Sequence, residues 1–188
     1  MFNFLLPFFL FFPDFLIKLF FNLPKSNDLT IDPKQWILCK ISPAEILGGP
    51  GKNAKDVRKS IESFSGGTKL PDTEKVDSTD HSLINENKTI KVREYFLKDG
   101  MKPKKAIMYI HGGGWSVCSI DTHDQLCRFF CTSLKMKIFS VDYRLAPENK
   151  YPLPLNDCFW AWNWLCTNAK KLDIRTQYLS IAGDSAGG

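Results

Sequence analysis

A serine near residue 188 lies in the pattern Gly-x-Ser-x-Gly, formed by Gly183, Ser185 and Gly187. A serine hydroxyl serves as a nucleophile toward acyl groups when a sharp turn between a strand and a helix presents it. The backbone of such a turn passes so close to itself that positions two before and two after the serine need glycine. The pattern therefore makes Ser185 a candidate catalytic nucleophile, although isolated Gly-Ser turns are common and a second motif is needed.

A second glycine-rich segment, His-Gly-Gly-Gly-Trp at residues 111–115, lies upstream of this serine. Successive glycines can turn their backbone N–H groups toward the negative oxygen that develops when a nucleophile attacks an ester carbonyl. We expect the N–H groups of Gly113, Gly114 and Ala186 to form such an oxyanion hole. A flexible turn would also explain three glycines, but it predicts neither a strand before them nor a glycine-flanked serine two strand–helix units later.

The chain that carries these motifs alternates between short apolar strands and longer helical patterns. A turn at Asp99–Gly100 predicts a hairpin between the first two strands, and Thr122 with Gln125 predicts a capping box on the first helix. The alternation predicts an α/β fold with a mostly parallel sheet and helices on both faces. The expected strands are 89–97, 105–110, 137–142 and 178–182, and the expected helices lie near 122–134 and 153–170.

Three motifs together resemble the hormone-sensitive-lipase family of α/β-hydrolases: HGGG at 111–114, DYRLAPE at 142–148 and GDSAGG at 183–188. The resemblance covers roughly residues 89–188 and implies the N-terminal part of an α/β-hydrolase fold. It also implies a carboxylesterase or lipase that hydrolyses a small ester of a short or medium acyl chain and needs no cofactor. It gives His111 a role in holding the glycine loop rather than a role as general base.

Composition divides the chain into three regions. Residues 1–23 are rich in phenylalanine, with nine of the fifteen in residues 1–21, and predict a hydrophobic lid, an interfacial helix on a membrane surface or an anchor. Residues 24–85 are polar and predict irregular structure with short helices; the resemblance makes them part of a cap. Residues 86–188 are expected to be a truncated α/β-hydrolase core. A cytoplasmic or membrane-associated protein fits this division.

The charges and the cysteines indicate no further ligand. The net charge of +5 arises from lysines that cluster in turns without interleaved aromatic residues, so we expect no nucleic acid partner. The six cysteines lack Cys-x-x-Cys spacing, which argues against a zinc ribbon or a dense disulfide framework. His123, Cys127 and Cys131 would share one helix face, but burial of cysteine on an apolar face explains that spacing better than a metal site.

Several charged residues near the motifs invite a catalytic interpretation. Asp142, Arg144 and Glu148 are expected to form a buried, paired network that stabilises the loop after their strand, because buried charges need partners. Asp184 adjoins the nucleophile, and we expect its role to be structural.

The sequence lacks the rest of a catalytic triad. In α/β-hydrolases the order along the chain is serine, then a carboxylate, then histidine. The three histidines, His81, His111 and His123, all precede Ser185. We therefore expect the carboxylate and the histidine to follow residue 188, and the 188 residues alone to be inactive. A non-catalytic binding protein on the same fold and a membrane-tethered amidase or deacetylase are the alternative interpretations.

Overall fold

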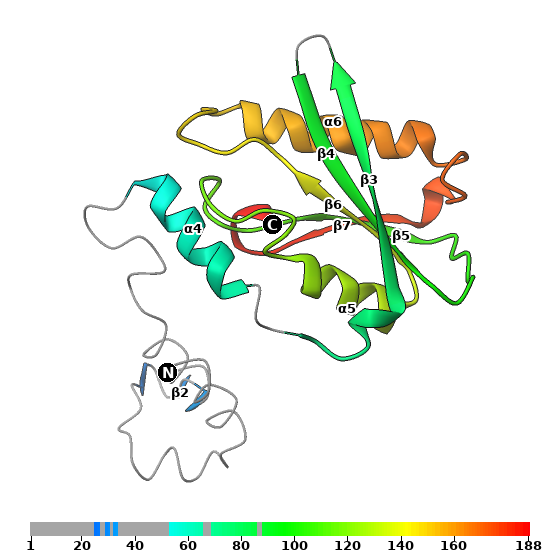
Figure 1. Ribbon diagram of the computed structural model, residues 1–188, viewed down its shortest axis with the longest axis horizontal. Coiled ribbons are helices and arrows are strands. Elements are labelled where there is room, and N and C mark those ends of the chain that lie inside the picture. The colour runs from blue at the N-terminus through cyan, green and yellow to red at the C-terminus, as the bar shows by residue number, and fades with distance from the viewer. Residues whose placement is uncertain (1–24, 27–28, 31, 34–52, 66–68, 86–87) are drawn as a thin grey trace. The chain divides into compact units, whose positions relative to one another are not determined.

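The computed structural model describes residues 25–26, 29–30, 32–33, 53–65, 69–85 and 88–188 (Figure 1). The chain divides into two compact units, residues 1–51 and 52–188. The first unit contains β1 (Lys25–Ser26) and β2 (Leu29–Thr30), which form an antiparallel pair. The region predicted as a lid, interfacial helix or anchor lies outside the described residues. Among the helices that the structure describes, none is both long enough and apolar enough to cross a membrane.

The second unit is built on a five-stranded sheet with the order β3-β4-β6-β5-β7 (Figure 1). β5 runs parallel to both of its neighbours, β6 and β7, whereas β4 runs antiparallel to β3 and β6. Four of these five strands therefore share one direction, which confirms the predicted α/β architecture. The strands are β3 (Val76–Asn85), β4 (Lys88–Leu97), β5 (Ala106–Ile110), β6 (Lys137–Asp142) and β7 (Leu179–Gly183).

Two helices cover opposite faces of this sheet, and a third precedes it in the chain (Figure 1). α5 (Asp124–Leu134) and α6 (Leu153–Asn168) are the covering helices, and both were predicted to within two residues at each end. α4 (Ala54–Ser65) comes before β3. Short 3-10 helices complete the unit: η1 (Thr73–Lys75), η2 (Thr176–Tyr178) and η3 (Ser185–Gly187).

The alternation of side chains along the strands explains the two covered faces. In β5, Met108 packs in the core beside α6, and its neighbour Tyr109 packs in the core beside α5. In β6, Phe139 belongs to the first of these cores and Ile138 to the second. Since both faces of β5 and β6 are covered, their sequences are short apolar runs rather than alternating ones.

The hairpin predicted between residues 89–97 and 105–110 is wrong. β4 pairs with β3 and β6, and β5 lies between β6 and β7. The prediction of irregular structure with short helices is likewise wrong for residues 76–85, which form β3. β3 is an edge strand whose polar side chains find partners on β4, as Asp80 does with Arg93. The polar composition of residues 76–85 therefore did not indicate a strand.

The predicted capping box on α5 is also wrong. The helix begins at Asp124, and no side chain caps its N-terminus. The Thr122 hydroxyl donates to the Ser119 carbonyl and accepts from the Ser119 N–H, while Gln125 Oε1 accepts from the Thr73 hydroxyl. The side chains of Thr122 and Gln125 thus form hydrogen bonds with residues that precede the helix and do not cap it.

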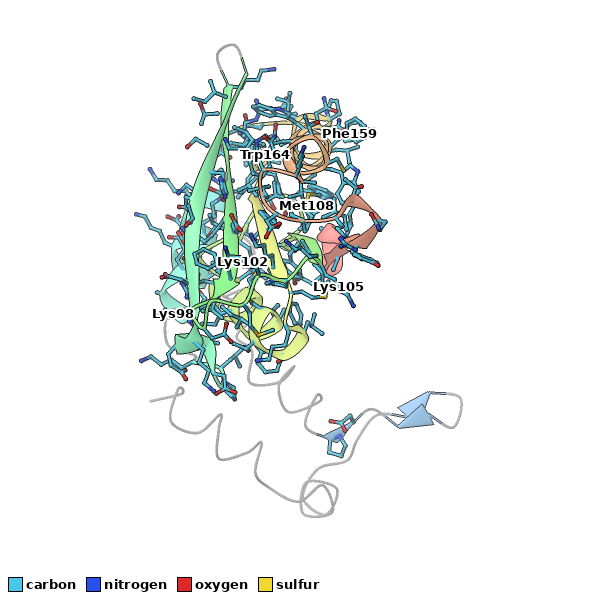
Figure 2. All side chains as sticks on the ribbon, turned by 90° about the vertical axis from the view of Figure 1, so that its right-hand side faces the viewer. Lys98, Lys102, Lys105, Met108, Phe159 and Trp164 are labelled. Carbon is cyan, nitrogen blue, oxygen red and sulfur yellow. The ribbon has the colours of Figure 1, made fainter. Side chains whose placement is uncertain are left out.

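The core beside α6 gives a prediction for stability. Met108, labelled in Figure 2, is 2% exposed within that core, whereas Met101, in the loop before β5, is 49% exposed. Met108→Ala should lower the unfolding free energy of the full-length protein by about 2–5 kcal/mol, because it removes apolar contacts and leaves a cavity. The control Met101→Ala should change it by less than about 0.5 kcal/mol. Urea unfolding measures both changes in free energy. Equal changes in the two variants would show that Met108 does not lie in this core.

Candidate active site

The two glycine-rich motifs meet at the carboxyl ends of two neighbouring parallel strands. Ile110, the last residue of β5, is paired in register with Gly183, the last residue of β7. Residues 111–114 and 184–187 therefore leave the sheet side by side. This is the edge at which open α/β sheets place their ligand sites.

Ser185 occupies a strained turn directly after β7. Its φ of 49° lies in the left-handed region, which side chains other than glycine rarely adopt. The flanking positions require glycine for space: a Cβ at Gly183 would collide with the Gly187 carbonyl, and a Cβ at Gly187 with the Ile110 carbonyl. These contacts match the strand–turn–helix context of a nucleophile elbow. The catalytic role of Ser185 remains a prediction.

The segment after β5 folds into a tight turn. Gly113 has a φ of +115°, and its carbonyl accepts hydrogen bonds from the N–H groups of Ser116 (3.1 Å) and Val117 (3.0 Å). Among the described residues, none accepts a hydrogen bond from the N–H of Gly113 or Gly114. Both donors are therefore available to an anionic oxygen. We call residues 113–117 the oxyanion turn; its assigned role, like that of Ala186 in η3, remains a prediction.

Asp184 ties the serine turn to the strand and loop beside it. Its Oδ1 accepts hydrogen bonds from the Gly112 N–H at 2.8 Å and from the Tyr109 hydroxyl at 2.7 Å, and it lies 3.4 Å from His123 Nε2. Burial alone would raise the pKa of Asp184, but the hydrogen bonds from Tyr109 and Gly112 and the neighbouring His123 lower it. The sequence suggested only a structural role, and these contacts show which segments the carboxylate joins.

His111, two residues before the oxyanion turn, is completely buried. Burial lowers its pKa to about 4, so the ring is neutral at pH 7. Its Nδ1 lies 2.7 Å from the Gly112 carbonyl, which the Nδ1–H of the neutral ring would reach as a donor. Tyr143 stacks on the ring at 4.3 Å and donates its hydroxyl proton to the His111 carbonyl at 2.7 Å. These contacts fix the loop before the turn.

The other two histidines also have partners of their own. His81 Nε2 lies 2.8 Å from Glu94 Oε2, and His123 Nδ1 lies 2.9 Å from the Thr122 hydroxyl. Within residues 53–65, 69–85 and 88–188, no histidine nitrogen is hydrogen-bonded to the Ser185 hydroxyl. No described histidine thus takes the position of a general base for this serine.

The network predicted among Asp142, Arg144 and Glu148 is wrong, because Arg144 and Glu148 pair with residues outside it. Arg144 binds both carboxylate oxygens of buried Asp157 on α6, at 2.7 and 2.6 Å. The exposed Glu148 binds Arg58 of α4, and burial raises the pKa of Asp142. A sequence pattern could not have named Asp157 or Arg58 as partners, since each lies on a different element. The only available signal was an aspartate within the apolar helix α6.

The potential metal ligands do not form a site. Cys127 and Cys131 are buried in the core beside α5, whereas His123 contacts Asp184. In the part of the chain that the structure describes, no group of three or more histidine, cysteine, aspartate or glutamate side chains is arranged to hold a metal ion.

A cavity of about 560 Å³ lies at the opposite end of the parallel strands, away from Ser185. Its lining residues include Lys137 and also Lys98 and Lys102, which are labelled in Figure 2. Lys137 is already bound to Glu94 Oε1 at 2.8 Å and to the Leu172 carbonyl. Because no serine, threonine or cysteine lines this cavity, the candidate active site is assigned from the two motifs and not from the size of a pocket.

Comparison with known proteins gives consistent matches. Residues 107–188 match a family model described as alpha/beta hydrolase fold. Carboxylesterase NlhH of Mycobacterium tuberculosis is 44% identical over 82 residues, which are 44% of this chain and 26% of that protein. The versiconal hemiacetal acetate esterase of Dothistroma septosporum is 36% identical over 118 residues, 63% of this chain and 35% of that protein. A hyperthermophilic esterase from the archaeon Pyrobaculum calidifontis superposes with a TM-score of 0.68 and 31% identity, covering 88% of this chain and 51% of that one.

The fold and these matches show that the chain has the α/β-hydrolase fold. Within that class, the resemblance to the hormone-sensitive-lipase family is confirmed. The alignments cover 26% and 35% of the two curated relatives and about half of the solved esterase.

The lowered pKa of Asp184 gives a prediction for pH dependence. Asp184→Asn should destabilise the full-length protein near neutral pH, because the amide cannot supply the charge that Gly112, Tyr109 and His123 face. The difference in unfolding free energy between wild type and variant is fully present above the unfolded aspartate pKa of about 3.9. It is lost as the pH falls through the lower pKa of the folded state. Urea unfolding at several pH values measures this difference, called the gap below. Asp99→Asn, in an exposed turn, is the control; a gap for Asp184→Asn that widens in acid would contradict the assignment.

Proposed function

We propose that the protein is a serine-dependent carboxylic ester hydrolase. The observation that carries this proposal is the placement of Ser185, in a strained turn, beside a glycine turn in which the N–H groups of Gly113 and Gly114 have no acceptor among the described residues. The named activities of the relatives support it, since they are a carboxylesterase and an acetate esterase. The proposed substrate is a small acyl ester, and no cofactor takes part.

The reaction proceeds through an acyl-enzyme. The Ser185 oxygen attacks the acyl carbonyl, and the carbonyl oxygen becomes negatively charged. The N–H groups of Gly113, Gly114 and Ala186 donate to this oxygen and stabilise the tetrahedral intermediate. The alcohol leaves with a proton, and water then attacks the acyl-enzyme and releases the acid.

The proton transfers need a base that the three histidines of this chain do not provide, because each is engaged with another partner. We expect a histidine and an orienting carboxylate in the part of the protein that follows Gly188. Residues 1–188 by themselves should therefore hydrolyse no ester above the buffer rate.

A membrane surface is the proposed location of the substrate encounter. The phenylalanine-rich residues 1–21 favour burial in an apolar phase, such as the boundary between lipid headgroups and acyl chains. A small ester with an apolar acyl chain concentrates in the same phase.

The serine mechanism is tested by Ser185→Ala in the full-length protein. The variant should lose turnover of p-nitrophenyl acetate and butyrate and should no longer be labelled by a fluorophosphonate, because the attacking oxygen is removed. Circular dichroism should show the same fold, since Ser185 is not fully buried. Turnover at the wild-type rate would place the nucleophile elsewhere and would reject the proposal.

The oxyanion turn is tested by Gly113→Ala. An alanine Cβ would collide with the Val117 carbonyl, and the turn would open and displace its donors. We expect kcat for the same esters to fall by about 100-fold, as for loss of one oxyanion donor. Gly100→Ala is the matched control: Gly100 also has a positive φ, of 78°, but no atom would lie within 4 Å of its Cβ. It should lower stability slightly and leave kcat unchanged; similar losses of kcat in both variants would contradict the assigned role.

A further inference from the structure

Arg58 of α4 uses almost all of its donors on two loops beside the candidate active site. Its Nε donates to the Ser116 carbonyl at 2.8 Å, and its Nη2 donates to the Ala146 carbonyl at 2.6 Å. Both terminal nitrogens also bind the Glu148 carboxylate, at 2.9 and 2.8 Å. Four of the five guanidinium N–H groups thus have acceptors on a segment other than α4.

The two carbonyls that Arg58 binds belong to the oxyanion turn itself and to the segment that is hydrogen-bonded to it. Ser116 lies within that turn, and its own N–H donates inward to the Gly113 carbonyl. The Ala146 N–H donates to the Trp115 carbonyl at 2.9 Å. The turn is therefore closed internally through Gly113 and held externally by Ala146 and Arg58. Rotation of the peptide groups at residues 115–116 would break contacts on both sides.

Glu148 keeps the guanidinium in one orientation. Hydrogen bonds from Arg58 lower the pKa of Glu148 to about 2, so its carboxylate stays charged throughout the neutral range. A planar guanidinium can bind a carboxylate with two nitrogens and still donate sideways to two carbonyls, whereas a lysine ammonium is a point donor without this fork. An arginine side chain can therefore bind this whole set of acceptors, whereas a lysine cannot.

We propose that Arg58 is a positioning residue through which α4 fixes the oxyanion turn in its donating orientation. This inference rests on the proposed ester hydrolysis and adds to it a residue more than fifty positions upstream of the glycines. Arg58 touches neither substrate nor nucleophile, and it acts through the carbonyls of Ser116 and Ala146. α4 then contributes to the active site through this one side chain.

The kinetic test compares Arg58→Ala and Arg58→Lys with wild type in the full-length protein, using p-nitrophenyl acetate. Arg58→Ala should lower kcat on the order of tenfold or more with little change in KM, because misplaced donors weaken binding of the transition state more than of the ester. Arg58→Lys should recover only a small part of kcat. The matched control is Arg128→Ala, because Arg128 also binds a carboxylate (Asp124) and a backbone carbonyl (Val76), but at the far end of the sheet. An equal effect of Arg128→Ala, or an unchanged kcat in Arg58→Ala, would overturn the inference.

Hydrogen exchange provides a readout that does not depend on turnover. The amides of Ser116, Val117 and Ala146 should exchange faster in Arg58→Ala than in wild type, while those of β5 and β6 should keep their protection. If the wild type hydrolyses no ester but this local change occurs, the proposed function fails and the positioning by Arg58 stands. If the wild type is active and exchange at these amides is unaltered, the positioning role is rejected and the proposed function stands.

Discussion

The close passage of two backbones at the ends of β5 and β7 is the constraint on which this site depends. A Cβ at Gly183 or Gly187 would collide with carbonyl groups, so the chain after β7 can lie against the end of β5 only because both side chains are absent. That proximity brings Asp184 within hydrogen-bonding distance of the Gly112 N–H. The parallel register of β5 and β7 pairs Ile110 with Gly183, so the loops that follow these strands begin beside one another. Without this contact, the serine and the glycine turn would be two unrelated loops.

Polar contacts around the site serve mainly to hold backbone in place. Asp184 joins the serine turn to Tyr109 and Gly112, Tyr143 clamps the His111 carbonyl, and Arg58 binds carbonyls on two loops. In each case a side chain satisfies a peptide group that irregular structure would otherwise leave unpaired. These hydrogen bonds thereby attach the loops at this edge to one another and to the strand β5.

The sequence predicted the part of the fold in which local patterns and tertiary structure agree. β6 was predicted without error, and α6 and β7 to within two residues, because apolar runs and helical periodicity report burial directly. The edge strand β3 was missed because its side chains are polar and its pairing with β4 cannot be read from composition. The partners of Arg144 and Glu148 were missed for the same reason: Asp157 and Arg58 come close only after the chain has folded. The serine and glycine motifs could be identified as candidates from the sequence because the close packing of their backbones requires glycine at fixed positions.

In the proposed site, the donors to the reacting oxygen are peptide N–H groups, and this has a consequence for how such a protein can diversify. A donor that belongs to the backbone cannot be lost by exchanging a side chain, as long as the turn keeps its shape. The groups that bind the reacting oxygen and the groups that surround the rest of the ester are then encoded by separate residues. New acyl or alcohol preferences can arise by altering the surrounding segments, while the machinery for bond cleavage is inherited intact.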